Sequence, residues 1–212
     1  MTVLVLAATK GGTGKSVLAL NIAVLADSGR RQVLLVNADP HGGVANWRRL
    51  RQAQRPVVAS TSAERTVADL VKAGRREGAD LIVIDTPAEV PASGSVTRAA
   101  IELADFVLVP VRASAMDLLG VRPTVMAATD SGRRCALVIT QLPGRSSARF
   151  EEASAAAERL EVGVCPHVIS HRVVWGDAAD TGLGVAEFDP SGRASEELID
   201  VWNWLRVQID GA

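Results

Sequence analysis

The chain has 212 residues, with 23 lysines and arginines against 24 aspartates and glutamates and a formal net charge of −1 at pH 7. This length allows one domain with a substantial core, and the near-neutral charge excludes a global field that would draw the chain onto nucleic acid or acidic membranes. Binding to either would need a local patch or dimerisation. The two cysteines, Cys135 and Cys165, have no close-spaced partners, so the sequence supports neither a zinc site nor a disulfide framework. Reduced, buried thiols in a cytosolic protein are expected.

Apolar, β-branched runs alternate with helical segments, an order typical of a parallel sheet buried on both faces. The expected strands are Val3–Ala8, Val33–Asn37, Pro56–Ala59, Leu81–Asp85, Phe106–Val111, Ala136–Thr140 and Val164–Ile169. The expected helices are Lys15–Ser28, Val44–Gln54, Ala63–Glu77, Ser95–Ala104, Met116–Thr129, Ser147–Leu160 and a closing helix over Ala194–Ile209. No linker is long enough to divide domains. The sequence therefore predicts a single α/β domain over residues 1–212, with a doubly wound, mostly parallel sheet.

No apolar run approaches the ~20 residues that a membrane-spanning helix needs, and no signal peptide is expected before the first strand. In open parallel sheets of this kind, ligands bind at the carboxyl ends of the strands. The polar residues that interrupt the apolar pattern are predicted to lie at this edge.

A glycine-rich loop, Lys10-Gly11-Gly12-Thr13-Gly14-Lys15-Ser16, lies between the first strand and the first helix. This order makes a phosphate cradle, because the backbone N–H groups and the helix N-terminus can surround phosphate oxygens. Lys15 is expected to reach the β- and γ-phosphates, and the Ser16 hydroxyl to ligate Mg²⁺. Thr9 stands where the general phosphate loop has its first glycine. Lys10 is an additional lysine that cannot easily fold back onto its own nucleotide, so we expect it to be free to reach a different one.

Carboxylates follow two of the predicted strands. Asp39 lies just past the second strand, where it can approach the γ-phosphate and the attacking water; a turn or helix cap at Asp39-Pro40 is the alternative. Asp85 ends the fourth strand after four apolar residues, where it would hold Mg²⁺ opposite Ser16. The turn over residues 86–95 has small residues and two prolines, which suits a switch that senses the γ-phosphate.

These motifs resemble the deviant Walker A box of the ParA/MinD group of ATPases, with Lys10 as the signature lysine. The resemblance covers nearly the whole chain and is strongest to the small plasmid-partition ParA proteins of the ParF type. It implies a P-loop NTPase fold of the deviant Walker A (SIMIBI) type, ATP and Mg²⁺ as cofactors, and Lys10, Lys15 and Asp39 as catalytic residues. Where the family carries Asp-x-Asp-Pro-Gln, this chain has Asn37 for the first aspartate and His41 for the glutamine. Asn37 can still hydrogen-bond but carries no charge, and we interpret His41 as a polar substitute.

The resemblance also assigns contacts farther along the chain. By position, Gln141 after the sixth strand and Ser170 after the seventh would contact the nucleotide base, although neither is the residue most often seen there. Arg145 and Arg172 match positions of DNA contacts, and arginine is well suited to phosphate. A second basic cluster, for which a solvated helix face is equally expected, comprises Arg48, Arg49, Arg51 and Arg55.

The implied mechanism is an ATP-sandwich homodimer, in which each Lys10 crosses to the partner's nucleotide and acts like an arginine finger. The implied protein is a cytoplasmic, nucleoid-associated ATPase with slow, Mg²⁺-dependent, partner-stimulated turnover. It would bind DNA nonspecifically and partition plasmid or chromosomal DNA with a small ParB-like centromere-binding or adaptor protein. No membrane partner is expected.

Other functions remain open. A ParA-like ATPase that positions a protein cargo on the nucleoid shares this chemistry, and the sequence does not separate the two; a nucleotide-binding scaffold without turnover is also open. A MinD-like membrane switch would need a basic amphipathic tail, whereas the segment Glu196–Leu205 is amphipathic but acidic. The chain has no tyrosine for the tail of a related tyrosine kinase, and no cysteines at the loops that a nitrogenase-like iron protein requires.

Overall fold

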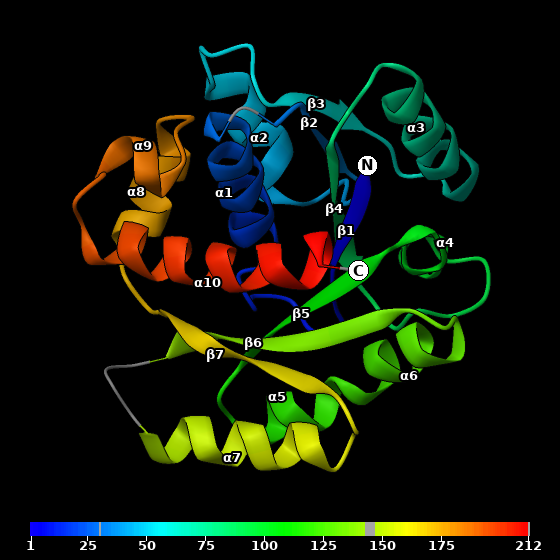
Figure 1. Cartoon of the computed structure of the whole chain (residues 1–212), viewed down its shortest axis with the longest axis vertical. Helices are drawn as coiled ribbons and strands as arrows, with labels where there is room; N and C mark the ends of the chain where they lie inside the picture. Colours follow the sequence, from blue (N-terminus) through cyan, green and yellow to red (C-terminus); the bar gives the residue numbers. More distant parts are fainter. Residues whose placement is uncertain (30, 143–146, 212) are drawn as a thin grey trace.

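The computed structural model describes residues 1–29, 31–142 and 147–211. A seven-stranded sheet lies between two layers of helices (Figure 1). The strand order is β3-β2-β4-β1-β5-β6-β7, and all neighbouring strands run parallel. The predicted α/β fold with a parallel sheet is therefore confirmed. The strands are β1 (Thr2–Ala8), β2 (Val33–Asn37), β3 (Val57–Ser60), β4 (Leu81–Ala88), β5 (Phe106–Arg112), β6 (Arg134–Leu142) and β7 (Gly163–Ser170).

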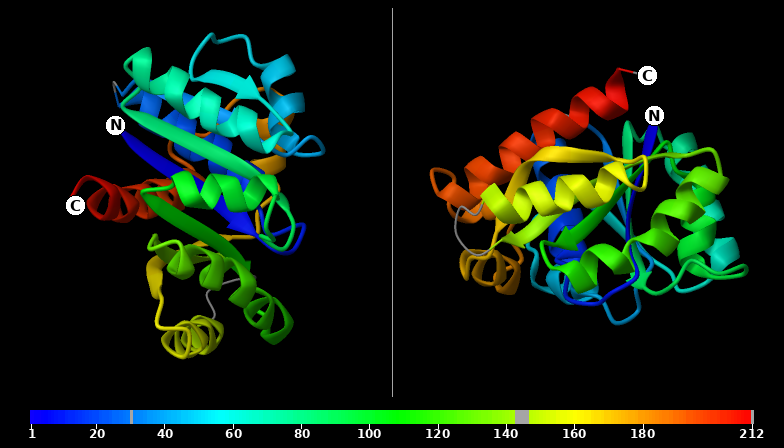
Figure 2. Two further views of the ribbon diagram at one scale, coloured as in Figure 1. Left: turned by 90° about the vertical axis from the view of Figure 1, so that its right-hand side faces the viewer. Right: turned by 90° about the horizontal axis from the view of Figure 1, so that it is seen from below.

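Helices cover both faces of the sheet, as the two views of Figure 2 show. They are α1 (Lys15–Ser28), α2 (Gly43–Leu50), α3 (Glu64–Arg76), α4 (Val96–Leu103), α5 (Ala115–Gly120), α6 (Arg122–Asp130), α7 (Ser147–Glu158), α8 (Val174–Asp180), α9 (Val185–Phe188) and α10 (Arg193–Asp210). None of these helices, in the described part of the chain, combines the length and hydropathy that a bilayer crossing requires.

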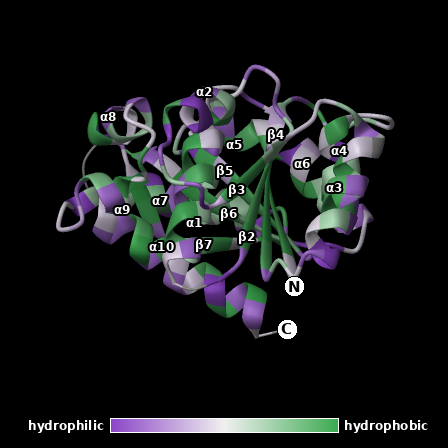
Figure 3. Cartoon of the chain, turned by 90° about the horizontal axis from the view of Figure 1, so that it is seen from above, coloured by the Kyte–Doolittle hydropathy of each residue, from purple (hydrophilic) through white to green (hydrophobic). Residues whose placement is uncertain are grey.

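Each face of the sheet has its own hydrophobic core. Successive side chains of a strand point to opposite faces, so Leu4 and Leu6 of β1 pack with α1, α2, α8, α9 and α10, whereas Val3 and Val5 pack with α3, α4, α5, α6 and α7. Figure 3 shows the resulting concentration of hydrophobic residues along the strands. Burial on both faces explains the continuous apolar runs in the sequence.

Two helix predictions were wrong in their extent. The single helix predicted over residues 116–129 is interrupted at Val121, where α5 gives way to α6. Pro123, in the first turn of α6, has no N–H to donate to the carbonyl of Leu119, so one continuous helix cannot form. The short helices α8 and α9 were not predicted from the sequence, and α2, predicted to reach Gln54, ends at Leu50.

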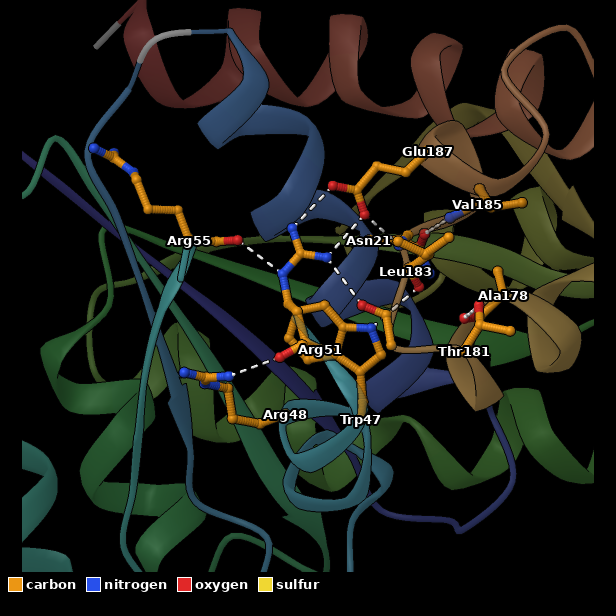
Figure 4. A network of polar contacts seen from close by, with 12 residues as sticks. Asn21, Trp47, Arg48, Arg51, Arg55, Ala178, Thr181, Leu183, Val185 and Glu187 are labelled. Carbon is orange, nitrogen blue, oxygen red and sulfur yellow. Dashed lines mark hydrogen bonds and ion pairs between the residues drawn. The ribbon is translucent and has the colours of Figure 1, made fainter. Parts of the chain in front are cut away.

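Arg51 explains why α2 stops early (Figure 4). Its backbone is extended, and its buried guanidinium pairs with Glu187 at 2.8 Å, donates to the Gly182 carbonyl at 3.0 Å and lies over the Trp47 ring. The backbones approach so closely that a Cβ on Gly182 would lie 2.5 Å from the Arg51 nitrogen. Trp47 adds a hydrogen bond from its indole nitrogen to the Leu183 carbonyl at 3.1 Å. Arg51 was expected in a basic cluster on the surface. It is instead a buried structural residue that holds α2 against the α8–α9 connection.

Arg51→Met is expected to lower the free energy of unfolding by about 2–4 kcal/mol, because it leaves the Glu187 carboxylate without its buried partner. Urea unfolding at constant pH measures this change. The matched control is Arg49→Met, on the exposed side of the same helix, with an expected change within about 0.5 kcal/mol. Equal stabilities of the two variants would contradict the assigned role of Arg51.

Candidate nucleotide-binding site

The loop between β1 and α1 surrounds a cavity of about 280 Å³. Gly12 and Gly14 have φ angles of +71° and +80°, a conformation that glycine adopts without strain. They turn the backbone so that α1 begins at Lys15 with its N-terminal end at the cavity. An N-terminus in this position favours an anionic ligand. The cavity is lined by Lys10, Gly11, Gly12, Thr13, Gly14, Lys15, Ser16, Val17, Asp39, His41, Gly42, Gly43 and Ala88.

A buried ion pair lies beside this cavity. Lys15 Nζ is 3.7 Å from Asp85 Oδ1, and both side chains are buried. Burial raises the pKa of Asp85 to about 6, although the charge of Lys15 opposes this shift. Neither Asp85 carboxylate oxygen has a hydrogen-bond partner in the described chain. The β2–β4 register places Asn37 next to Asp85, and the Asn37 Oδ1 atom is also buried without a partner.

These unpaired oxygens fit the chemistry of Mg²⁺. Buried polar atoms are almost always satisfied, and Mg²⁺ accepts oxygen ligands from one or two side chains together with waters and substrate phosphates. Among the described residues, no group of three or more His, Cys, Asp or Glu side chains could hold a metal without such help. Ser16 and Asp85 are the residues that would hold the ion when a nucleotide supplies its phosphates.

Asp85→Asn is expected to stabilise the nucleotide-free protein at pH 8 in the presence of a chelator. The folded chain holds the Asp85 proton more tightly than the unfolded chain. Ionisation of Asp85 therefore lowers the free energy of unfolding, and this cost grows as the pH rises from 3.8 to about 6 and persists above that value. This cost of ionisation is about 3 kcal/mol at pH 8 and is lost as the pH falls below 3.8. Thermal unfolding across this pH range, with the exposed Asp69→Asn as control, measures the difference. A gain that does not depend on pH would contradict this account.

Asp39 lies on the same cavity. Its Oδ1 accepts a hydrogen bond from the His41 backbone N–H at 2.9 Å, and its carbonyl accepts one from Gly42 at 3.1 Å. The N-cap of α2 is Gly42, so Asp39 stabilises a turn before the helix and does not cap it. The structure thus brings Asp39 and His41 together with the phosphate loop, as the sequence predicted for Asp39.

Lys10 is held within its own chain. Its Nζ donates to the Met116 carbonyl at 2.7 Å and to Asp117 Oδ1 at 3.0 Å. Asp117 also accepts hydrogen bonds from Arg112 and Ser114, both at 2.8 Å. Burial opposes ionisation, but these hydrogen bonds lower the pKa of Asp117 to about 2, so it is a carboxylate at neutral pH. In the single chain the ammonium group of Lys10 is therefore engaged by α5, and the expectation that Lys10 reaches a different nucleotide stays a prediction.

A second cavity, of about 180 Å³, shares Gly14 and Val17 with the phosphate cavity. Gln141 and Ser170, the predicted base contacts, both line it. Two hydrogen bonds join the end of β6 to the phosphate loop: Gln141 Nε2 donates to the Gly12 carbonyl at 2.6 Å, and the Thr140 hydroxyl donates to the Thr13 carbonyl at 2.7 Å. Gln141 adopts a φ angle of +52° in this arrangement. The lining comprises Gly14, Val17, Leu18, Thr140, Gln141, Ile169, Ser170, His171, Arg172 and Trp175.

Of the two arginines predicted to contact DNA, the structure describes one. Arg172 lines the second cavity and donates to Glu197 at 2.8 Å, so in this chain it lies at the candidate nucleotide site. Arg145 lies outside the described residues. Sequence reasoning missed Trp175, Asp117 and Glu197, because each acquires its role only from a partner brought near by the fold.

Comparison with known proteins agrees with this geometry. The family model of the CobQ/CobB/MinD/ParA nucleotide binding domain (CbiA) matches residues 4–185. The chain belongs to this family. The resemblance to ParA and MinD proteins, first stated on the glycine loop and the strand ends, is therefore confirmed.

Individual relatives extend the match to nearly the full chain. The chain is 31% identical over 211 residues to the maintenance of carboxysome distribution protein A of Halothiobacillus neapolitanus, covering 94% of both chains. Its fold is similar to that of Cyanothece McdA in complex with ATP, with a TM-score of 0.74 and 17% identity over 97% of this chain and 96% of the other. A plasmid partition protein of Borrelia burgdorferi bound to AMPPNP has a TM-score of 0.69 and 17% identity, covering 98% and 99%.

Proposed function

We propose that the chain is an Mg²⁺-dependent ATPase that dimerises on ATP, binds DNA and positions a protein cargo on the nucleoid. One observation supports the proposed ATPase activity: the two lysines of the phosphate loop have separate ion-pair partners. Lys15 pairs with the buried Asp85, and Lys10 pairs with Asp117 of α5. The cargo part is supported by the carboxysome-distribution relative, which matches 94% of both chains. This support favours a protein cargo over the partition of plasmid or chromosomal DNA, the function expected first. DNA partition remains the second candidate because of the plasmid partition protein with a similar fold.

Each group of residues around the phosphate cavity would have a separate role in binding or hydrolysis. Backbone N–H groups of residues 11–16 and Lys15 bind the phosphates, while Ser16 and Asp85 hold Mg²⁺, which neutralises charge on the phosphate oxygens. Asp39 orients the water that attacks the γ-phosphate, and the His41 N–H holds the Asp39 carboxylate in place. Gln141 and Ser170 contact the base from the second cavity.

Dimerisation would exchange the partner of Lys10. In the single chain its ammonium group binds Asp117, and in the sandwich dimer it binds the phosphates of the facing subunit. ATP offers an anionic partner that compensates for the lost Asp117 contact, so the dimer forms only when the nucleotide is bound. Hydrolysis removes this partner and returns Lys10 to its own subunit. The two surfaces joined in the dimer would double any basic patch, which is how a chain with a net charge of −1 could bind DNA.

The proposal places the protein in the cytoplasm on nucleoid DNA, with a small adaptor protein that links it to the cargo and stimulates hydrolysis. An acidic C-terminal helix gives no support to membrane binding.

Lys10→Ala is expected to bind ATP almost normally but to lose ATP-dependent dimerisation, DNA binding and stimulated hydrolysis together. Loss of a buried charge contact of this kind costs about 2–5 kcal/mol, enough to dissociate a dimer held near micromolar affinity. Sedimentation with a slowly hydrolysed ATP analogue, followed by DNA retention of the same samples, measures both effects. Lys72→Ala, on the exposed face of α3, is the matched control. A Lys10→Ala protein that still dimerises and retains DNA would refute the sandwich-dimer switch.

Asp39→Ala is expected to bind ATP and Mg²⁺ and to accumulate as the ATP-bound dimer, because it loses the group that orients the attacking water. Hydrolysis should fall by about 10²-fold or more, as measured by phosphate release in the presence of DNA. Asp69→Ala controls for the loss of a carboxylate elsewhere on the surface. Normal turnover in Asp39→Ala would reduce Asp39 to a residue that stabilises the turn.

A further inference from the structure

Glu197 joins the closing helix α10 to the second cavity. Its carboxylate accepts hydrogen bonds from three donors: the Ser170 backbone N–H at 2.9 Å, the Ser170 hydroxyl at 2.8 Å and Arg172 Nη2 at 2.8 Å. Glu197 itself does not line the cavity, whereas both of its partners do. It therefore acts on the site through other residues.

The contacts fix Ser170 from both sides. While Glu197 holds the N–H and the hydroxyl, the Ser170 carbonyl accepts a hydrogen bond from the indole nitrogen of Trp175 at 3.2 Å. Trp175 is itself a wall of the cavity and is almost completely buried. One carboxylate thus binds two cavity residues, Ser170 at the end of β7 and Arg172 in the segment that follows, and Trp175 of α8 is joined to them through Ser170.

The charge of Glu197 suits this role. Partial burial raises its pKa, but hydrogen bonds from Arg172 and Ser170 hold the pKa below its ordinary value, so the side chain is ionised at neutral pH. Hydrogen bonds to an ionised acceptor are stronger than those between neutral groups. Arg172 keeps one buried nitrogen, Nε, without a partner in the described chain, next to the cavity that its side chain lines.

We propose that Glu197 is a positioning residue for the nucleotide base: it holds Ser170 and Arg172 as one preformed wall of the second cavity. The inference rests on the proposed assignment of this cavity to the base. It also assigns Arg172 to the nucleotide site, since Arg172 lines this cavity and donates to Glu197 beside Ser170.

A residue that positions the base should affect base binding and leave phosphate binding unchanged, whereas a residue that supports the fold in general should affect both. The phosphate cavity is built from the loop after β1, the start of α1, the segment after β2 and Ala88 of β4, and neither Glu197 nor its partners line it. Loss of the Glu197 contacts should therefore weaken the binding of ligands that carry a base and spare ligands that consist of phosphate alone.

The test compares Glu197→Gln with Glu196→Gln, the same chemical change at an exposed neighbouring position on α10. Calorimetric titration of the full chain with Mg²⁺ and ATP, ADP or tripolyphosphate gives three affinities for each variant. We expect Glu197→Gln to weaken ATP and ADP binding by the same factor, about tenfold, as for the loss of one charged hydrogen bond. Its tripolyphosphate affinity should stay within about twofold of wild type, and Glu196→Gln should match wild type for all three ligands.

Two results would overturn the proposal: unchanged ATP and ADP affinities in Glu197→Gln, or an equal loss for nucleotides and tripolyphosphate. Ser170→Ala provides a second, milder variant that removes only the hydroxyl contact. It should weaken the binding of ATP and ADP by a smaller factor. In the double variant, the affinity for ATP and ADP should fall by less than the product of the two single factors, because the groups act as a unit. A fall in affinity equal to that product would contradict the shared wall. If the wild-type chain binds tripolyphosphate but no nucleotide, the base assignment fails, and if it binds none of the three ligands, the proposed function itself fails.

Discussion

Lys15 and Asp85 lie 3.7 Å apart beneath the phosphate loop, and this distance between two buried side chains is too long for a good hydrogen bond. The charge balance of the phosphate cavity depends on this incompletely satisfied pair. The strands β1 and β4 bring the two residues together because they are neighbours in the sheet and both end at this edge. A buried carboxylate with two unpaired oxygens is costly on its own, so the folded chain retains a local instability that a cation and an anionic ligand would relieve together.

The remaining parts of the site are held in place by contacts that originate elsewhere in the fold. Thr140 and Gln141 bind the backbone of the phosphate loop from the end of β6, and Arg51 fixes α2, the helix that follows Asp39 and His41. Glu197 performs the corresponding task for Ser170. The loop itself carries glycines with little intrinsic preference for one conformation. Its shape is therefore determined by hydrogen bonds from side chains more than 100 residues away in sequence.

The sequence predicted the parts of the molecule whose chemistry is local. Continuous apolar runs identified all seven strands. The signal is clearest for β1, β2, β4 and β5, because a strand buried on both faces needs no partner-specific information to be recognised, whereas the edge strands β3 and β7 are partly exposed. Lys15 and Ser16 followed from the loop pattern, and Asp85 from its place at a strand end. The partners of charged residues did not follow: Lys10 with Asp117, Arg51 with Glu187 and Arg172 with Glu197 are 107, 136 and 25 positions apart. Nothing near an arginine in the sequence distinguishes one that will face solvent from one that a distant helix will bury, so the basic cluster was misread at Arg51.

The position of α10 has a consequence for the order in which the protein acquires function during synthesis. Chains emerge from the ribosome N-terminus first, so the phosphate loop at residues 10–16 is made before Glu197 and the core side chains Leu198, Val201 and Leu205 of α10. Until α10 docks, Ser170 lacks the acceptor for its N–H and hydroxyl groups, and the hydrophobic face beneath the helix is uncovered. Thr140 and Gln141, which shape the phosphate loop, are also made before Glu197, so a nascent chain can form the loop before the wall formed by Ser170 and Arg172 is in place.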